Sequence, residues 1–245
     1  MYRAALLVSI LGGLSPASAA EPTLEEILDS SDDYARGDSS IARIQMEVHT
    51  RRYQRTMAMQ AWSEGTEKTL IRILEPAKDR GIATLKVDDH IWNYLPKVDR
   101  TMKVPAAMMS GSWMGSHFTN DDLVKESRLS EDFTGSVLER PENSQGNYLV
   151  ELVPRPDAPV VWGKVEIEVR PDLLPMEFRY YDEHDALVRT MTFGDFKELG
   201  GRTMPATMTL QPADEPEEFT RITYLELSID PEIDPSTFSV QSLRP

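Results

Sequence analysis

The sequence predicts a mainly β protein built on antiparallel strands. From Ile41 onward the apolar residues alternate with polar ones, as in Ile44, Met46 and Val48, which is the period of a strand with one buried face. Turn-forming residues interrupt this pattern roughly every eight to twelve residues, a spacing typical of a meander. The same pattern returns in the second half of the chain, and no helical period separates the strands. These three observations favour an antiparallel sheet over alternating helices and strands.

The first twenty residues predict a signal peptide rather than a part of the fold. Arg3 supplies a positive charge near the N-terminus, and residues 4–14 form a short apolar run. Residues 16–20 are small, as at the cleavage site of a signal peptide. The apolar run is too short to span a bilayer. We expect cleavage after Ala19 or Ala20, export to the periplasm, and a mature chain of about 225 residues.

A short helix is expected from Thr23 to Tyr34. Thr23 is suited to cap it, with Glu26 three residues later, and Leu24, Ile27 and Leu28 fall on one side. Residues 37–40 then break the chain. The predicted strands follow in order: Ile41–His49, Tyr53–Ser63, Lys68–Leu74, Ile82–Val87, Ile91–Leu95, Arg100–Val104, Phe133–Arg140, Tyr148–Val153, Lys164–Arg170, Pro175–Tyr181, Val188–Phe196, Thr203–Gln211 and Arg221–Ile229.

The two runs of strands are expected to form one domain over residues 21–245. Asn120–Leu123 resembles the start of a helical turn between them, with acids near its N-terminus. Pro154–Pro159 contains three prolines, but the strand pattern is the same on both sides, so we interpret it as a connector. The expectation is ten to twelve strands with one or two helices. Such a long sheet must curl, and its own side chains or a ligand must fill the concave side.

The loop after the sixth predicted strand is unusually apolar. Met108, Met109, Trp113, Met114 and Phe118 stand among glycines and serines, whereas loops are normally polar because water solvates their backbone. These side chains need an apolar partner, either a core or a ligand. Methionine adapts to irregular apolar partners. Two interpretations of the loop therefore stay open: a movable flap over a ligand, and ordinary core packing.

The strand before this loop carries two amphipathic aromatics on one face. Trp92 and Tyr94 are suited to the rim of an apolar cleft, although packing as plain core accounts for them equally well. Met102 lies on the next short strand. We therefore take as candidate ligand-binding residues Trp92, Tyr94, Met102, Met108, Met109, Trp113, Met114 and Phe118.

Composition and motifs argue against several classes of function. The net charge is −15, which argues against nucleic acid as a partner. The chain has no cysteine, so thiol nucleophiles, thiolate metal sites and a lipid-modified N-terminal cysteine are excluded. The four histidines are scattered, so no metal site is predicted. The serines near Gly111 and Gly115 do not form a nucleophile elbow, and no phosphate or dinucleotide fingerprint appears, so we expect no cofactor.

The region between residues 66 and 125 resembles the LolA-like family of outer-membrane lipoprotein-sorting proteins. That family carries a Trp-x-Tyr-Leu-Pro strand, a basic turn and a Gly-Ser-x-Met-Gly-Ser-x-Phe-x-x-x-Asp-Leu segment. The matching residues here are Trp92, Tyr94, Leu95, Pro96, Arg100, Gly111, Ser112, Met114, Gly115, Ser116, Phe118, Asp122 and Leu123. The runs Leu70–Ala77 and Arg80–Ala83 also resemble the family's strand-Pro-Ala-x-x-x-Gly stretch.

The resemblance implies a fold and a function. The fold is a strongly curved antiparallel sheet, an incomplete β-barrel, with one to three helices as a lid over an apolar cavity. The function is that of a monomeric periplasmic carrier, not an enzyme, that shields the acyl chains of a lipid or lipoprotein in transit. The implied partners are an inner-membrane transporter of RND or ABC type and an outer-membrane acceptor.

Two other functions stay open at this stage. The same half-barrel could serve an envelope sensor or adaptor that detects lipid or lipoprotein and signals through protein contacts. A hydrolase acting on a lipid-like substrate is less favoured, because the sequence offers no recognisable set of nucleophile, base and orienting group.

Overall fold

The structure is a computed structural model, and it describes residues 21–35, 37–124, 129–140, 146–158 and 160–244. The predicted signal peptide, residues 1–20, lies outside the described residues. The elements in chain order are α1 Leu24–Asp33, β1 Ser39–His49, β2 Gln54–Glu64, β3 Lys68–Glu75, β4 Ala83–Val87, β5 His90–Leu95, the 3₁₀ turn η1 Pro96–Val98, β6 Arg100–Lys103, η2 Ala106–Met108, α2 Asn120–Val124, α3 Leu129–Asp132, β7 Phe133–Glu139, β8 Tyr148–Pro154, β9 Lys164–Val169, β10 Pro175–Tyr181, β11 Leu187–Leu199, β12 Arg202–Pro212, β13 Phe219–Ile229, η3 Pro235–Phe238 and η4 Gln241–Leu243.

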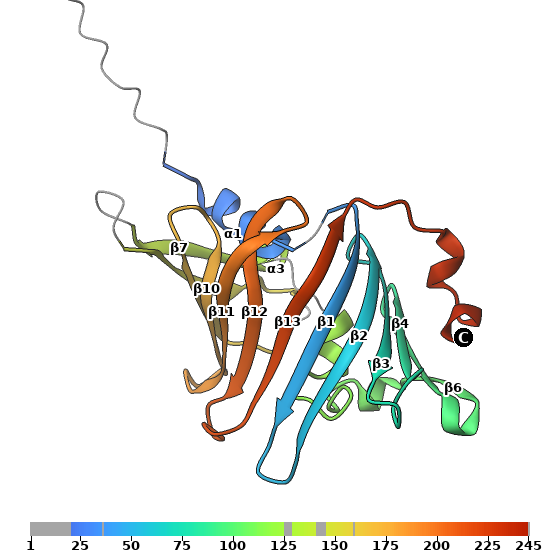
Figure 1. Cartoon of the computed structure of the whole chain (residues 1–245). Helices are drawn as coiled ribbons and strands as arrows, with labels where there is room; N and C mark the ends of the chain where they lie inside the picture. The colour runs from blue at the N-terminus through green and yellow to red at the C-terminus, as the bar shows by residue number, and fades with distance from the viewer. Residues whose placement is uncertain (1–20, 36, 125–128, 141–145, 159, 245) are drawn as a thin grey trace, which may run out of the picture.

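The described strands form one thirteen-stranded antiparallel sheet, which confirms the predicted fold class. The expected ten to twelve strands become thirteen, and each predicted strand has a counterpart. The sheet order is β6-β5-β4-β3-β2-β1-β13-β12-β11-β10-β9-β8-β7. Every neighbour is a sequence neighbour except β1 and β13, whose pairing joins the two meanders. The sheet is strongly curved and does not close (Figure 1).

Helix α1 begins where the sequence predicts. Thr23 accepts a hydrogen bond from the backbone N–H of Glu26, and the Glu26 carboxylate accepts one from the backbone N–H of Thr23, so both parts of a capping box are present. Ile27 and Leu28 are buried on one side of the helix. The helix packs against α3 and β7 at one end of the sheet (Figure 1).

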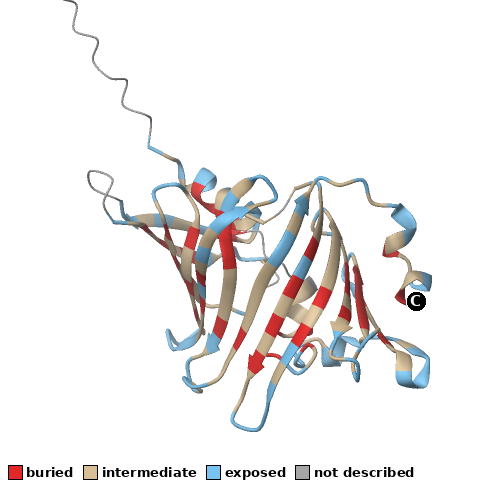
Figure 2. Cartoon of the chain, in the orientation of Figure 1, coloured by how far each residue is buried: buried red, intermediate tan, exposed pale blue. Residues whose placement is uncertain are grey.

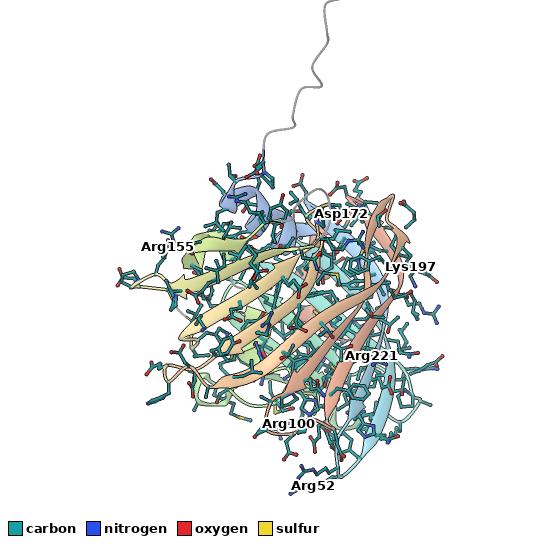
Figure 3. The ribbon with its side chains drawn as sticks, turned by 90° about the vertical axis from the view of Figure 1, so that its left-hand side faces the viewer. Arg52, Arg100, Arg155, Asp172, Lys197 and Arg221 are labelled. Carbon is teal, nitrogen blue, oxygen red and sulfur yellow. The ribbon has the colours of Figure 1, made fainter. Side chains whose placement is uncertain are left out.

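Alternation along the strands gives the sheet an inner, concave face and an outer, convex one. On β1, Ala42, Ile44, Met46 and Val48 are buried while the residues between them are more exposed. Figure 2 shows this alternation of buried and exposed positions along the strands. Charged side chains such as Lys197 and Arg221 project from the outer surface (Figure 3).

The C-terminal segment covers part of the convex face. After β13 the chain crosses to the other half of the sheet, where η3 and η4 contact β3 and β4 (Figure 1). Phe238 and Leu243 pack there in a convex cluster whose other buried members are Leu70, Ala83, Leu85 and Tyr94. The guanidinium of Arg72 donates to the backbone carbonyls of Leu243 and Ser242, at 3.2 and 2.5 Å. The C-terminal segment therefore shields this part of the outer face of β3–β5 from water.

The residues that follow β6 lie on the concave side of the sheet. The strands β6 and β7 are at opposite edges, and Trp113 and Phe118, which lie between them in the sequence, are buried in the main core. Residues 104–123, called here the crossing segment, contain the apolar loop and most of α2. Trp113 and Phe118 of this segment are buried against the sheet, whereas Met108 is exposed.

The packing of the C-terminal segment can be tested by shortening Leu243, whose side chain is fully buried. We expect Leu243→Ala to lower the free energy of unfolding by about 2–3 kcal/mol, because it removes buried methyl groups and leaves a cavity. Urea unfolding measures this change. Val240→Ala, at an exposed position of the same segment, is the control and is expected to change it by less than about 0.5 kcal/mol. Equal effects would contradict the packing.

Candidate functional site

The concave face contains a cavity of about 320 Å³. Its walls come from both halves of the sheet and from the segments that cross the sheet, and they are mainly apolar. The lining residues are Ser31, Asp32, Tyr34, Ala35, Ser40, Ala42, Ile44, Ala61, Ser63, Gly65, Thr69, Ile71, Trp113, Phe118, Asp122, Leu123, Trp162, Phe178, Tyr180, Arg189, Met191, Phe193, Met208, Ile222 and Tyr224.

Small side chains on β1 and β2 create the empty space. Ala42 pairs directly with Ala61, and Ser40 pairs with Ser63. All four line the cavity. Further along the same two strands, Met46 pairs with Met57, and both methionines are fully buried. The inner face is therefore filled where the paired residues are large and hollow where they are small.

Aromatic side chains form the opposite wall. Phe178 of β10 and Phe193 of β11 meet edge to face with ring centroids 4.9 Å apart, and Tyr34 packs on Phe193 at 5.6 Å. Such edge-to-face contacts are favourable and fix the rings in place. Together with Met191 and Met208 they give this wall a rigid apolar surface.

The crossing segment closes one side of the cavity. Trp113 is buried and lines it, and its indole N–H donates to the Thr84 hydroxyl on β4 at 3.1 Å. Phe118 is also buried and lines the cavity. The Tyr53 hydroxyl donates to the carbonyl of Gly115, and Arg55 donates to the carbonyl of Met114 at 3.2 Å. These contacts hold the segment against the N-terminal half of the sheet.

His117 ties the same segment to β13 and the turn before it. Its Nδ1 lies 2.8 Å from the Thr220 hydroxyl and its Nε2 lies 3.2 Å from the Glu218 carboxylate. A hydroxyl, an imidazole and a carboxylate in line resemble a catalytic triad. However, Thr220 is fully buried and also accepts the backbone N–H of His117 at 3.0 Å. The geometry therefore supports a structural attachment, because no substrate can reach the hydroxyl.

An ion pair attaches helix α2 to the C-terminal half of the sheet. Arg189 of β11 donates two hydrogen bonds to the Asp122 carboxylate, at 2.7 and 3.0 Å, and both side chains are largely buried. Burial alone would raise the pKa of Asp122, but the Arg189 guanidinium and the donors of Thr119 outweigh it and hold the pKa below its usual 3.8. Burial alone would lower the pKa of Arg189, but Asp122 outweighs it and raises that pKa.

Two aromatic rings complete the surroundings of Arg189. Its guanidinium carbon lies 4.5 Å from the ring centroid of Trp162 and 4.7 Å from that of Tyr180. These are cation–π distances. Arg189, Asp122, Tyr180 and Trp162 therefore form a compact polar and aromatic group within an otherwise apolar lining.

The structure places the predicted site residues in three different environments. Trp113 and Phe118 line the cavity. Trp92 and Tyr94 lie on the convex face, in or against the convex cluster, because the cross-strand pair Thr84 and Asn93 takes the concave side. Met102 and Met108 are exposed, while Met109 and Met114 are partly buried, and none of these four lines the cavity. A ligand contact for all eight residues remains a prediction.

Several lining residues were not among the predicted ones. The pairs Ala42–Ala61 and Ser40–Ser63 carried a usable signal, since small residues at alternate positions of adjacent strands leave room on one face. Asp122 is one of the residues that match the family segment, but nothing in the sequence links it to Arg189, which is 67 positions away.

Two further observations concern metal-binding groups and membrane-spanning helices. Within the described ranges, no group of three or more His, Asp or Glu residues is arranged to hold a metal ion. No helix in that part of the chain is both long enough and apolar enough to cross a membrane.

Comparison with known proteins places the fold. A family model described as "-like: Uncharacterized protein" matches residues 65–245. None of the curated proteins matches the chain. Solved structures of similar fold include a domain described as an outer membrane lipoprotein-sorting protein from Vibrio parahaemolyticus, with 23% identity, a TM-score of 0.74, and coverage of 90% of this chain and 98% of that one.

Two other structures are similar to the same degree. A LolA superfamily protein from Nitrosomonas europaea has 20% identity and a TM-score of 0.72, covering 90% of this chain and 99% of that one. A DUF1329 family protein from Desulfovibrio piger has 21% identity and a TM-score of 0.77, covering 90% and 97%. At these identities the similarity establishes the fold, an open LolA-like half-barrel.

The buried ion pair leads to a pH-dependent prediction. At pH 7, Asp122→Asn should lower the free energy of unfolding by about 3 kcal/mol, because it leaves the Arg189 charge uncompensated. The folded pKa of Asp122 is lowered, so its contribution is present above pH 3.8 and is lost as the pH falls through the folded value. Thermal unfolding of both proteins between pH 7 and pH 2 measures this, and the difference should shrink only at the acid end.

The control for this prediction is Asp195→Asn. Asp195 pairs with Lys197 at 3.1 Å on the surface, where both side chains are exposed. Such pairs contribute only about 0–1 kcal/mol. A pH-independent loss in Asp122→Asn, or an equal loss in both variants, would contradict the role given to the buried pair.

Proposed function

We propose that this chain, whose fold is that of a LolA-like half-barrel, is a carrier that binds acyl chains of a lipid or lipoprotein in the cavity and passes them between membranes. The chain belongs to the family whose model matches residues 65–245. The observation that carries the proposal is the hollow beside Ala42 and Ala61. Apolar cavities are rarely left empty in cores, since each void loses the dispersion contacts of its walls. A hollow of this size is suited to a ligand.

The free energy of transfer explains why such a carrier is needed. Each methylene group buried from water contributes about 0.8 kcal/mol, so an acyl chain leaves a membrane slowly unless another apolar surface receives it. The apolar walls described above provide that surface. The cavity of about 320 Å³ is near the lower end of the range for small-molecule sites, roughly 300–1,000 Å³. It accommodates part of one acyl chain as it stands.

A larger cargo requires the crossing segment to move. That segment is held by Trp113 on β4, by His117 on β13 and by Asp122 on β11. Release then depends on a partner that stabilises the open arrangement, because a ligand shifts a conformational equilibrium only by its preference for one state. The methionines of the segment, Met108, Met109 and Met114, act as the adaptable surface that follows the cargo.

The setting of this activity follows from the same proposal. Residues 1–20 direct export, and residues 21–245 work in the periplasm as a single half-barrel domain and as a monomer. The donor is an inner-membrane transporter of RND or ABC type, and the acceptor lies in the outer membrane. No catalytic step is assigned to the chain.

Filling the hollow tests the proposal directly. Ala61→Phe places a ring in the cavity and should weaken binding of a hydrophobic fluorescent probe by more than about ten-fold, because losing contact with only two methylenes costs about 1.6 kcal/mol. Ala58→Phe is the matched control, since Ala58 lies on the same strand but faces the other side of the sheet. Probe titration and thermal unfolding of both variants give the result. Unchanged binding in a folded Ala61→Phe protein would refute the proposal.

The role of the methionines is tested by the triple change Met108→Ser, Met109→Ser and Met114→Ser. We expect weaker probe binding and a nearly unchanged Tm, because these side chains are exposed or only partly buried. A large fall in Tm with intact probe binding would instead identify the methionines as structural.

A further inference from the structure

Hydrogen-bond donors gather in one part of the cavity wall, and one of them, the Nε–H of Arg189, is buried without an acceptor among the described residues. Tyr180 is 9% exposed, yet its hydroxyl has no hydrogen bond to any residue that the structure describes. Arg189 lines the cavity beside it, and so does the partly buried Trp162, whose indole N–H is a further donor. Buried polar groups are nearly always hydrogen-bonded, so donors left over in a cavity indicate a ligand that brings acceptors.

The surrounding contacts keep these donors from finding partners within the protein. Tyr180 and Arg189 are directly paired across β10 and β11. The terminal nitrogens of Arg189 are engaged by Asp122. The rings of Trp162 and Tyr180 lie 5.0 Å apart and both contact the guanidinium. We call Trp162, Tyr180 and Arg189 the donor cluster.

The charge near the cluster restricts which acceptor fits. Asp32 and Asp122 line the cavity with Arg189, so two carboxylates and one guanidinium give a formal charge of −1. Burial raises the pKa of Tyr180 to about 12; Arg189 opposes this shift, and Asp122 and Asp32 add to it. At neutral pH the phenol is therefore a donor in a slightly negative environment, which disfavours a carboxylate or phosphate.

We propose that the donor cluster binds the uncharged ester or amide carbonyl that joins an acyl chain to its head group. Such a carbonyl supplies the missing acceptor without adding charge, and the chain attached to it lies along the apolar walls. This inference rests on the proposed carrier function and refines it. The cavity thereby selects esterified or amide-linked chains over free fatty acids.

The test compares dodecanoate with its methyl ester, at pH 7, as competitors for a bound hydrophobic fluorescent probe. The wild-type protein should bind the ester more tightly than the carboxylate. Tyr180→Phe removes only the hydroxyl and should weaken ester binding by about three- to ten-fold more than it weakens probe binding, the range for one hydrogen bond. Tyr181→Phe is the control, because that hydroxyl donates to Glu166, 2.9 Å away, on the other face of the sheet.

The outcomes separate this inference from the carrier function. Equal ester affinity in Tyr180→Phe and wild type, or dodecanoate binding as tightly as its ester, would overturn the donor cluster as a carbonyl site while leaving the carrier in place. Failure of the probe and of both dodecyl compounds to bind the wild-type protein would overturn the carrier function and this inference together. A parallel loss in Tyr181→Phe would assign the effect to the fold rather than to the site.

Discussion

The pairing of β1 with β13 is the constraint on which the rest of the structure depends. It joins two meanders into one sheet and leaves β6 and β7 at opposite edges. The crossing segment, which follows β6, lies on the concave side, where Trp113 and Phe118 form part of the cavity wall. The same pairing directs the residues after β13 toward the far half of the sheet, where they cover the convex face of β3–β5. The pairing of β1 with β13 thus sets the positions of the core, of the crossing segment and of the C-terminal segment that covers the convex face.

Side-chain size decides where the concave face is filled and where it is hollow. Paired methionines fill one part of the β1–β2 ladder, while paired alanines and serines leave the other part empty. Twisted sheets of this length curl whatever their sequence, so curvature alone does not make a binding site. The hollow needs small residues paired on adjacent strands. It also needs a crossing segment whose side chains do not fill the space beside them.

The fold could be predicted from the sequence because its determinants are local. Strand alternation, turns and the Thr23–Glu26 capping box each act within a few residues. The eight candidate residues were harder to place. Alternation puts Trp92 and Tyr94 on a common face, but only the long-range packing of Phe238 and Leu243 shows that this face is buried away from the cavity. The Asp122–Arg189 pair joins distant segments, so no sequence pattern predicts it.

Apolar walls that enclose a small group of hydrogen-bond donors favour an amphiphile as the ligand of this cavity, and a carrier is the function that best uses such a ligand. The most direct measurement is native mass spectrometry, with solvent extraction, of the protein purified from the periplasm without detergent. The account predicts a bound species that carries an acyl chain through an ester or amide and that is lost in Ala61→Phe. A protein that retains only its polypeptide mass, in wild type and variant alike, would contradict it.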